Sequence, residues 1–309
     1  MTKVLLSPSS IGQCGSQPMD LLLKNGYEII PNPFGRKLTP EETIELAKDA
    51  AGVVAGVETY DKSVLDSLPN LKCISRVGVG MDSIDLDYAQ ERGVIIKNTP
   101  FGPTKAVAEL SIALAMNLLR NIGYSDRSIR EGVWKKSIGN LIEDKEVGIL
   151  GLGRIGKATA MKYQALGCRV SAYDLYPDEK WMSENGVLSK SFEEVLKNSD
   201  LISIHVPGGS FDGAVIGRAE LNLVKHNAVL INLSRGGVVD EAALFDFLKK
   251  NETAKAALDV FSEEPYSGPF TKLENVVLTP HLGSYAKEGK LAMEVDAVKN
   301  LMDALEETK

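Results

Sequence analysis

The stretch that decides the fold runs from Val147 to Gly156 and reads VGILGLGRIG. Its three spaced glycines are Gly151, Gly153 and Gly156. An apolar run precedes them and a helical pattern follows, which is the strand–turn–helix context in which such glycines bind a dinucleotide. The first glycine allows a tight turn, the second lets a pyrophosphate approach the backbone, and the third lets the helix pack closely on the strand. The free N–H groups of this turn, with Arg154 and Ile155 at the start of the helix, then face the phosphates.

A carboxylate stands at the end of the next predicted strand. Asp174 follows Gly151 at close to the offset of about 20 residues expected for the acid that binds the adenine ribose hydroxyls. A carboxylate there repels a 2′-phosphate, and the next residues, Leu175 and Tyr176, offer no arginine to bind one. The sequence therefore predicts NAD, rather than NADP, as the cofactor.

Apolar runs alternate with helical patterns on both sides of this stretch. The first hundred residues have strand-like runs at 3–6, 28–31, 52–55, 73–77 and 94–97. A second series has them at 146–150, 169–173, 201–205, 229–233, 256–260 and 275–279. This alternation predicts parallel strands joined by crossover helices. The predicted fold class is therefore α/β, with two doubly wound parallel-sheet domains.

The domain boundaries follow from the same pattern. The helical segment at 287–305 has no strand after it, so we expect it to cross back and cover the first domain. The first domain would then comprise residues 1–100 and 286–309, and the second residues 101–285. Within the first domain, Thr39, Pro40 and Glu42 predict a capping box at the start of a helix.

The composition argues against several classes of partner. The chain has 309 residues, 44% hydrophobic and 25% charged, with a formal charge of −7, so both domains can bury a core without a basic surface for nucleic acid or an anionic membrane. No run approaches the roughly 18 apolar residues of a membrane span, and the N-terminus lacks a signal-peptide pattern, so we expect a cytoplasmic protein. Cys14, Cys73 and Cys168 form no CxxC pair, which predicts small buried residues and no metal site.

Side chains at strand ends of the second series could act together on a 2-keto acid. Such chemistry needs a cation for the carboxylate, a proton donor for the carbonyl oxygen, and a group that keeps the donor protonated. Arg235 follows the run at 229–233 and precedes two glycines. A guanidinium can hold a carboxylate with two hydrogen bonds, although a solitary arginine is more often a solvated surface charge.

The proton donor is expected among the three histidines. His205 ends an apolar strand and is predicted to be partly buried beside the cofactor, while His226 lies in a polar loop and is predicted to be a surface residue. His281 follows the strand at 275–279 and is the expected proton shuttle. A carboxylate beside it would favour the imidazolium; Glu263 and Glu264 are adjacent rivals, and the residues alone do not choose between them.

A series of motifs resembles the D-isomer-specific 2-hydroxy acid dehydrogenase family, and its phosphoglycerate dehydrogenase branch in particular. They are Arg76 to Asp85, Asn98-Thr99-Pro100, Ala106 to Glu109, the glycine turn, Ser234 to Gly237, Asp259-Val260-Phe261 with Glu264-Pro265, and Thr279-Pro280-His281. The resemblance covers nearly the whole chain. It implies a flavodoxin-like substrate domain, an inserted Rossmann NAD-binding domain, an active site in the cleft between them, and a homodimer formed through the cofactor domain.

The resemblance also assigns residues. It makes Arg235, Glu264 and His281 the catalytic trio, which favours Glu264 over Glu263. It implies that Asp259 holds the nicotinamide amide. Backbone N–H groups of Gly78, Val79 and Gly80 would receive the substrate carboxylate, leaving Arg235 to share that contact or to adjoin it. Further cofactor contacts are expected from His205, Val206, Pro207, Leu233 and Ser234.

The substrate is a small-molecule acid whose identity depends on fewer residues. Arg76 resembles the basic residue that meets the substrate phosphate in many phosphoglycerate enzymes, although a loop arginine paired with a nearby carboxylate is the plainer interpretation. The sequence departs from the family pattern at Ala55, Pro207 to Asp212 and Ser284-Tyr285.

The leading hypothesis is oxidation of 3-phosphoglycerate to 3-phosphohydroxypyruvate with NAD, a step of serine biosynthesis. The alternatives are reduction of glyoxylate, hydroxypyruvate or pyruvate by the same residues, and a catalytically silent NAD-sensing interaction protein. Because the sequence ends at Lys309, without the regulatory domain that some phosphoglycerate enzymes carry, serine feedback through such a domain is not expected.

Overall fold

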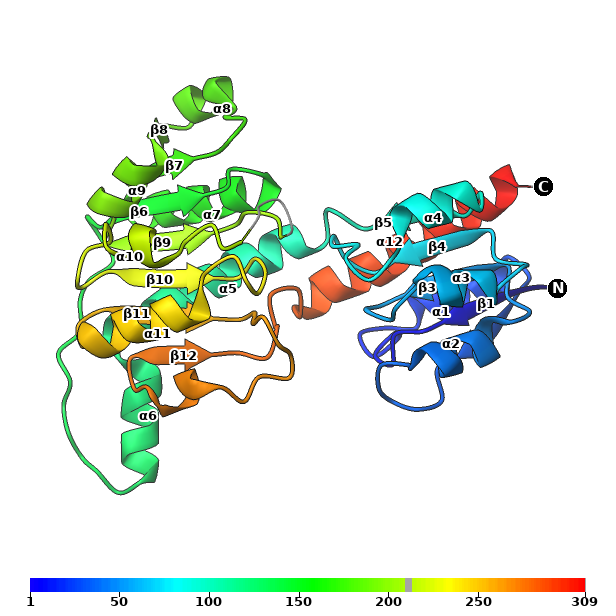
Figure 1. The fold of residues 1–309 in the computed structure, drawn as a ribbon, viewed down its shortest axis with the longest axis horizontal. Coiled ribbons are helices and arrows are strands. Elements are labelled where there is room, and N and C mark those ends of the chain that lie inside the picture. Colours follow the sequence, from blue (N-terminus) through cyan, green and yellow to red (C-terminus); the bar gives the residue numbers. More distant parts are fainter. Residues whose placement is uncertain (209–212, 309) are drawn as a thin grey trace. The chain divides into compact units, whose positions relative to one another are not determined.

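The computed structural model describes residues 1–208 and 213–308 and divides into two compact units (Figure 1). Unit 1 comprises Met1–Pro103 with Ser284–Lys309, and unit 2 comprises Thr104–Gly283. Each unit is built on a parallel β-sheet with helices on both faces. The predicted α/β class with two doubly wound sheets is therefore confirmed.

The sheet of unit 1 has the order β2-β1-β3-β4-β5, with every neighbouring pair parallel. Its strands are β1 (Thr2–Leu6), β2 (Tyr27–Pro31), β3 (Gly52–Ala55), β4 (Cys73–Arg76) and β5 (Ile95–Asn98). This is the flavodoxin-like order, in which ligands bind beyond the carboxyl ends of the strands.

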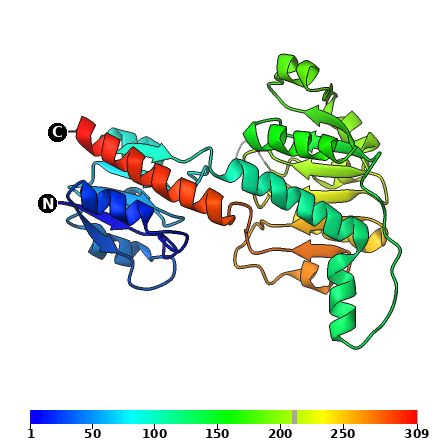
Figure 2. The same cartoon turned by 180° about the vertical axis from the view of Figure 1, so that it is seen from behind.

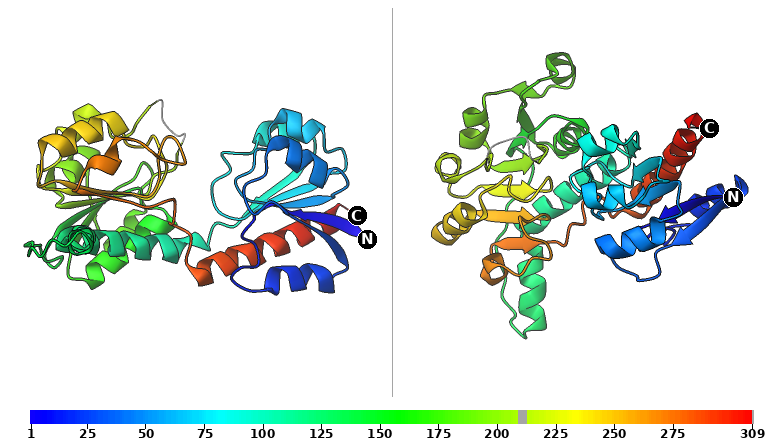
Figure 3. Two further views of the ribbon diagram at one scale, coloured as in Figure 1. Left: turned by 90° about the horizontal axis from the view of Figure 1, so that it is seen from below. Right: turned by 45° about the vertical axis from the view of Figure 1, so that its right-hand side comes forward.

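Helices cover both faces of this sheet. One face carries α2 (Pro40–Ala47), α3 (Lys62–Asp66) and α4 (Leu86–Glu91), and the other carries α1 (Gln17–Lys24) and α12 (Lys287–Glu307) (Figure 3, left). Figure 2 shows α12 lying across the sheet beside α1. Ala297, Val298 and Leu301 of α12 are fully buried against β1, β3 and β4, so the last helix packs on the sheet of unit 1. The capping box is also present, since Thr39 Oγ1 accepts from Glu42 N and Glu42 Oε2 accepts from Thr39 N.

The sheet of unit 2 has the order β12-β11-β10-β9-β6-β7-β8, again with parallel neighbours. The strands are β6 (Glu146–Leu150), β7 (Arg169–Tyr173), β8 (Leu188–Ser189), β9 (Leu201–Ile204), β10 (Val229–Asn232), β11 (Lys255–Leu258) and β12 (Val276–Leu278). The sequence predicted six of these strands and missed β8, because its two residues are both exposed and show no apolar alternation.

Two apolar layers cover the faces of this sheet. The helices are α5 (Pro103–Arg120), α6 (Ile122–Arg130), α7 (Arg154–Ala165), α8 (Glu179–Glu184), α9 (Phe192–Asn198), α10 (Arg218–Leu221), α11 (Glu241–Lys250) and the 3₁₀ turn η1 (Pro269–Lys272). The strand order reverses between β6 and β9, so the loops after these two strands flank the switch point at which doubly wound sheets bind ligands.

All three cysteines are free; Cys73 and Cys168 are buried as predicted, but Cys14 is partly exposed because it lies in the loop after β1. Over the described ranges, no helix combines the length and the apolar composition needed to cross a membrane.

Candidate active site

The glycine turn after β6 has the conformation that its sequence predicts. Gly151 has φ +88°, and a Cβ there would lie 2.7 Å from the carbonyl oxygen of His205, so any larger residue would be both strained and obstructed. A Cβ at Gly156 would lie 2.0 Å from the oxygen of Gly151, whereas a Cβ at Gly153 would meet nothing within 4 Å. The turn is therefore tight on the protein side and open at Gly153. Gly153 caps α7 without a side chain, which leaves N–H groups for a pyrophosphate.

Asp174 ties the end of β7 to this turn. Its Oδ2 accepts a hydrogen bond from Leu152 N at 2.6 Å, and its Oδ1 accepts one from Tyr176 N at 2.8 Å. A carboxylate has about four lone-pair positions, so it can still accept bonds from ribose hydroxyls. The glycine turn and this carboxylate together fit an NAD-type dinucleotide.

His205 follows β9 on the other side of the switch point. Its N–H donates to Leu150 O at 2.7 Å, and its Nε2 lies 2.8 Å from Ser203 Oγ. Ser203 continues through Ser111 to Tyr163 in a buried chain of hydroxyl groups. Burial lowers the pKa of His205 to about 4, so this ring is neutral near pH 7. Val206 and Pro207 follow it, and residues 209–212 of the atypical segment lie outside the described residues.

Glu264 and His281 form a pair at the carboxyl ends of β11 and β12. Glu264 Oε2 lies 3.0 Å from His281 Nδ1, and Glu264 Oε1 accepts from Phe261 N at 3.1 Å, which orients the carboxylate. The side chains are 49% exposed for His281 and 38% for Glu264, so a ligand can reach the ring. The structure thus brings together two of the three predicted catalytic side chains, and it pairs Glu264 with the histidine.

The Asp259 carboxylate binds the segment that carries His281, a contact that the resemblance did not imply. Its buried carboxylate accepts three hydrogen bonds from the segment that carries His281, namely from Thr279 Oγ1 at 2.5 Å, Leu282 N at 2.7 Å and Gly283 N at 2.8 Å. Burial raises the pKa of Asp259 against the lowering effect of these bonds. His281 itself has φ +55°, an unusual conformation for a histidine. Asp259 therefore holds the turn that presents His281, a role signalled in the sequence only by the polar Thr279.

Arg235 lies on a turn after β10 that is stabilised by hydrogen bonds of the Asn232 side chain. Asn232 Oδ1 accepts from Ser234 N and Ser234 Oγ, and Asn232 Nδ2 donates to Arg235 O. A Cβ at Gly236 would lie 1.9 Å from Phe261 O, so this glycine lets the Arg235 turn pack against the backbone that leads to Glu264. Leu233 and Ser234 are buried within the turn. Sequence reasoning missed Asn232, whose position as the last residue of β10 was the available signal.

In unit 1, the loop after β4 is supported by β5. Gly78 N donates to Thr99 Oγ1 at 2.7 Å, Thr99 N donates to Gly78 O at 3.0 Å, and Asn98 Nδ2 donates to Val79 O at 2.9 Å. The Gly78 N–H is thus already paired within the unit. Arg76 folds over Gly78, where its guanidinium occupies the place of a Cβ, and its Nη1 donates to Val77 O at 2.6 Å.

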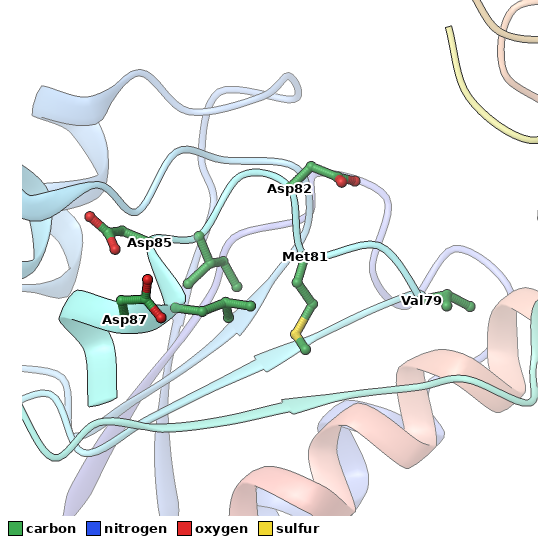
Figure 4. Close-up of a pocket in the computed structure, with 7 residues that line it drawn as sticks. Val79, Met81, Asp82, Asp85 and Asp87 are labelled. Atoms are coloured by element: carbon green, nitrogen blue, oxygen red, sulfur yellow. The ribbon is translucent and has the colours of Figure 1, made fainter. Parts of the chain in front are cut away.

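A pocket of about 630 Å³ adjoins this loop (Figure 4). Val79 and Met81 line it together with three carboxylates, Asp82, Asp85 and Asp87. Among the described residues, no group of three or more His, Cys, Asp or Glu side chains is placed to hold a metal ion.

Residues 112–283 match the family described as "D-isomer specific 2-hydroxyacid dehydrogenase, NAD binding domain". The chain is 42% identical over 255 residues to a glyoxylate reductase of Thermococcus litoralis, covering 79% of this chain and 77% of the relative. It is 38% identical over 280 residues to a D-3-phosphoglycerate dehydrogenase of Archaeoglobus fulgidus, covering 89% of this chain and 53% of the relative.

Among solved structures, the TT0316 protein of Thermus thermophilus superimposes with a TM-score of 0.89 at 32% identity, covering 99% of this chain and 97% of the other. The chain spans about half the length of the phosphoglycerate dehydrogenases that it matches. The family match and the glycine turn with Asp174 identify residues 112–283 as an NAD-binding domain. On this evidence the chain belongs to the D-isomer specific 2-hydroxyacid dehydrogenase family.

Proposed function

We propose that this chain transfers a hydride between nicotinamide and C2 of a D-2-hydroxy acid or the corresponding 2-keto acid. The observation that carries the proposal is the 3.0 Å pair of Glu264 Oε2 and His281 Nδ1, located in the unit that contains the NAD-binding domain. A half-exposed imidazole with a fixed carboxylate on one nitrogen has its other nitrogen available for a substrate oxygen.

Arg235, Glu264 and His281 have different roles in this reaction. When bound, NAD accepts the hydride and NADH donates it. In reduction, His281 Nε2–H donates a proton to the carbonyl oxygen, while Glu264 accepts from Nδ1–H and stabilises the charged ring. In oxidation, the same nitrogen takes the hydroxyl proton. Arg235 holds the substrate carboxylate with charge-assisted hydrogen bonds, and Asp259 fixes the turn that presents His281.

We assign a second carboxylate contact to the loop after β4. Because Gly78 N already donates to Thr99, the N–H groups of Val79 and Gly80 are the better candidates to receive the substrate. This narrows the three-residue contact that the family resemblance implied.

For the substrate itself, 3-phosphoglycerate is our first candidate. Arg76 supports it, because a phosphate needs a positive partner on an otherwise acidic protein. Reduction of glyoxylate, hydroxypyruvate or pyruvate is the second candidate. Asp82, Asp85 and Asp87 around the pocket beside Val79 favour this second candidate, because their charges oppose a phosphate dianion.

Steady-state kinetics on 3-phosphoglycerate, glyoxylate, hydroxypyruvate and pyruvate test both levels of the proposal. If Arg76 holds the phosphate, Arg76→Ala lowers kcat/KM for 3-phosphoglycerate by about 10- to 100-fold and changes the unphosphorylated acids little. Unchanged kinetics with 3-phosphoglycerate would eliminate the first candidate. If the protein binds NAD but interconverts NAD and NADH with none of the four acids, the proposed activity is wrong and an NAD-sensing role is favoured.

We also propose that the chain forms a homodimer through residues 122–141 of unit 2. This segment exposes several large apolar side chains, of which Trp134 is 84% and Ile138 97% exposed. The others are Ile122, Ile129, Val133 and Leu141. An apolar set of this size on one segment is typical of a protein interface. Sedimentation velocity tests it: Trp134→Asp with Ile138→Asp should yield monomers, and an unchanged sedimentation coefficient would refute this interface.

A further inference from the structure

A chain of hydroxyl groups crosses the interior of unit 2 and ends at the ring of His205. Tyr163 Oη lies 3.1 Å from Ser111 Oγ, which lies 3.0 Å from Ser203 Oγ. Ser203 Oγ in turn lies 2.8 Å from His205 Nε2. Tyr163 is on α7 and Ser111 is on α5, two helices that cover the same face of the sheet (Figure 2), and Ser203 is in the central strand β9. None of these hydroxyl groups has a role in the reaction proposed above.

Packing alone does not explain these hydroxyl groups. Tyr163, Ser111 and Ser203 are fully buried. A hydroxyl in such a place costs free energy unless it is hydrogen-bonded, whereas alanine and phenylalanine would fill much the same space without a polar atom. A buried serine on a helix often bonds to a carbonyl of its own helix, as Ser199 does with Val195 O at 2.6 Å. Ser111 Oγ instead bonds to another helix and to the sheet.

The chemistry of the two end groups gives the chain a direction. Each hydroxyl has one hydrogen to donate. A phenol is a better donor than an aliphatic alcohol, and a neutral imidazole nitrogen is a better acceptor than a hydroxyl oxygen, which favours Tyr163 as the first donor and His205 as the last acceptor. Burial raises the pKa of Tyr163 and lowers the pKa of His205, so the phenol keeps its hydrogen and the ring is neutral. Ser203 then donates to Nε2, and the one hydrogen of the ring is on Nδ1.

The His205 ring lies beside the dinucleotide turn. The His205 N–H donates to Leu150 O, and the His205 carbonyl oxygen lies 2.7 Å from the place that a Cβ at residue 151 would take. The side chain is partly exposed, whereas Ser203, which holds Nε2, is fully buried. Within residues 1–208 and 213–308, no protein group pairs with Nδ1. The Nδ1–H group is therefore available to a ligand bound at the turn.

We propose that Ser203, Ser111 and Tyr163 are positioning residues for the cofactor: they hold His205 as the tautomer with hydrogen on Nδ1, which donates to an oxygen of the bound dinucleotide. The ring cannot flip or change tautomer without losing its bond to Ser203. A neutral imidazole without such a partner divides between two tautomers, and only one of them could make the bond to the cofactor. The inference rests on the NAD-binding domain and not on the proposed hydride transfer.

Nitrogen NMR of the full chain, labelled in its three histidines, tests the tautomer. The two nitrogens of a neutral imidazole differ widely in chemical shift according to which one carries the hydrogen. The signals that disappear in His205→Asn identify this ring. At about pH 7.5, where the ring is neutral, the wild type should have its hydrogen on Nδ1, and Ser203→Ala should populate both tautomers. Hydrogen on Nε2 in the wild type would overturn the proposal.

Fluorescence titration with NADH tests the effect on cofactor binding. Ser203→Ala should raise the Kd for NADH about 3- to 10-fold, and Tyr163→Phe, which removes only the first donor, about 2- to 3-fold. Ser199→Ala and Tyr60→Phe are the matched controls, because each removes a buried hydroxyl outside the chain. Both should leave the Kd and the His205 tautomer unchanged.

Two results would contradict this role. One is a Kd for Ser203→Ala equal to that for Ser199→Ala, and the other is a raised Kd in Ser203→Ala with the tautomer of the wild type. If Ser203→Ala does not fold, the same comparison is made between Tyr163→Phe and Tyr60→Phe, and equal Kd values would again overturn the proposal. Neither measurement uses a substrate, so a failure here is distinct from a failure of the proposed activity.

Discussion

Two histidines of unit 2 follow parallel strands of one sheet, yet they differ in their hydrogen-bond partners and in their exposure. His205 follows β9, and its partly buried ring pairs with the hydroxyl of Ser203. His281 follows β12, pairs with the carboxylate of Glu264 and is half exposed. Desolvation lowers the pKa of His205 and keeps the first ring neutral near pH 7, whereas the second ring has a carboxylate as its partner. Position at a strand end therefore does not by itself make a histidine a proton shuttle.

The backbone creates this difference. His205 keeps the pairing of its strand, because its N–H donates to Leu150 O in the neighbouring strand, and its ring is partly buried against Ser203. His281 leaves its strand at φ +55°, in a turn held by three hydrogen bonds to Asp259. The turn places the ring against Glu264 while the His281 side chain remains half exposed. Asp259 therefore supports this arrangement from the side of the backbone, and Glu264 from the side of the ring.

The largest expected effect comes from replacing His281, the proposed proton shuttle. His281→Asn should lower kcat/KM by about 10³-fold, within the range for a lost general acid–base catalyst. His205→Asn should lower it by less than about 10-fold, because a neutral ring beside the cofactor turn contributes only positioning. Steady-state reduction of the best 2-keto acid measures both, with NADH fluorescence titration to verify cofactor binding. Equal losses in the two variants would show that the two histidines do not differ in their contribution to catalysis.

Glu264→Gln should have the next largest effect, about 10- to 100-fold on kcat. The amide cannot stabilise the charged imidazolium, so reduction, which needs the protonated ring, should suffer more than oxidation. Glu263→Gln is the matched control, because the adjacent carboxylate should change kcat by less than about 2-fold. If Glu263→Gln is the more damaging change, the assignment of the carboxylate partner is wrong.

Asp259→Asn tests the turn. In the variant, an NH2 group replaces one of the two carboxylate oxygens. This NH2 group then faces the N–H of either Leu282 or Gly283, and the hydrogen bond that the oxygen accepted there is lost. We expect a loss of about 1–3 kcal/mol in the free energy of unfolding, measured in urea, and about a 10-fold lower kcat. Thr279→Val removes one of the three bonds and should cost less in both measurements. An unchanged kcat in a destabilised Asp259→Asn protein would show that the turn supports the fold and not the catalysis.

Much of the fold could be predicted because its determinants are local. Gly151, Gly153 and Gly156 in one strand–turn–helix fix the dinucleotide turn, and the capping box at Thr39 and Glu42 fixes a helix start. Each of these features needs only a few consecutive residues. The short strand β8 was not predicted, because its two exposed residues show no alternation of apolar and polar side chains.

The details of the site were harder, because they depend on contacts between distant segments. The choice between Glu263 and Glu264 depends on which side chain faces a residue 17 positions further along the chain. The bonds from Asp259 to Thr279, Leu282 and Gly283 span 20 to 24 positions. The pairing of Gly78 N with Thr99 spans 21 positions and depends on the register of β4 beside β5. Such contacts exist only once the strands are paired, so no pattern along the chain reports them.

The smallest predicted effect is on how the free energy of unfolding depends on pH. The pKa of His205 falls from 6.5 to about 4 on folding, so between these values the unfolded chain binds one proton more than the folded protein. Stability therefore rises with pH across that interval and falls as the solution is acidified below pH 6.5. Comparison of the wild type with His205→Asn isolates this group from the other titrating residues. The free energy of unfolding of the wild type should decline by about 1–2 kcal/mol more than that of the variant between pH 6.5 and 4.5. Parallel curves would mean that the His205 ring accepts a proton in the folded protein as readily as in the unfolded chain, and burial would then not distinguish the two histidines.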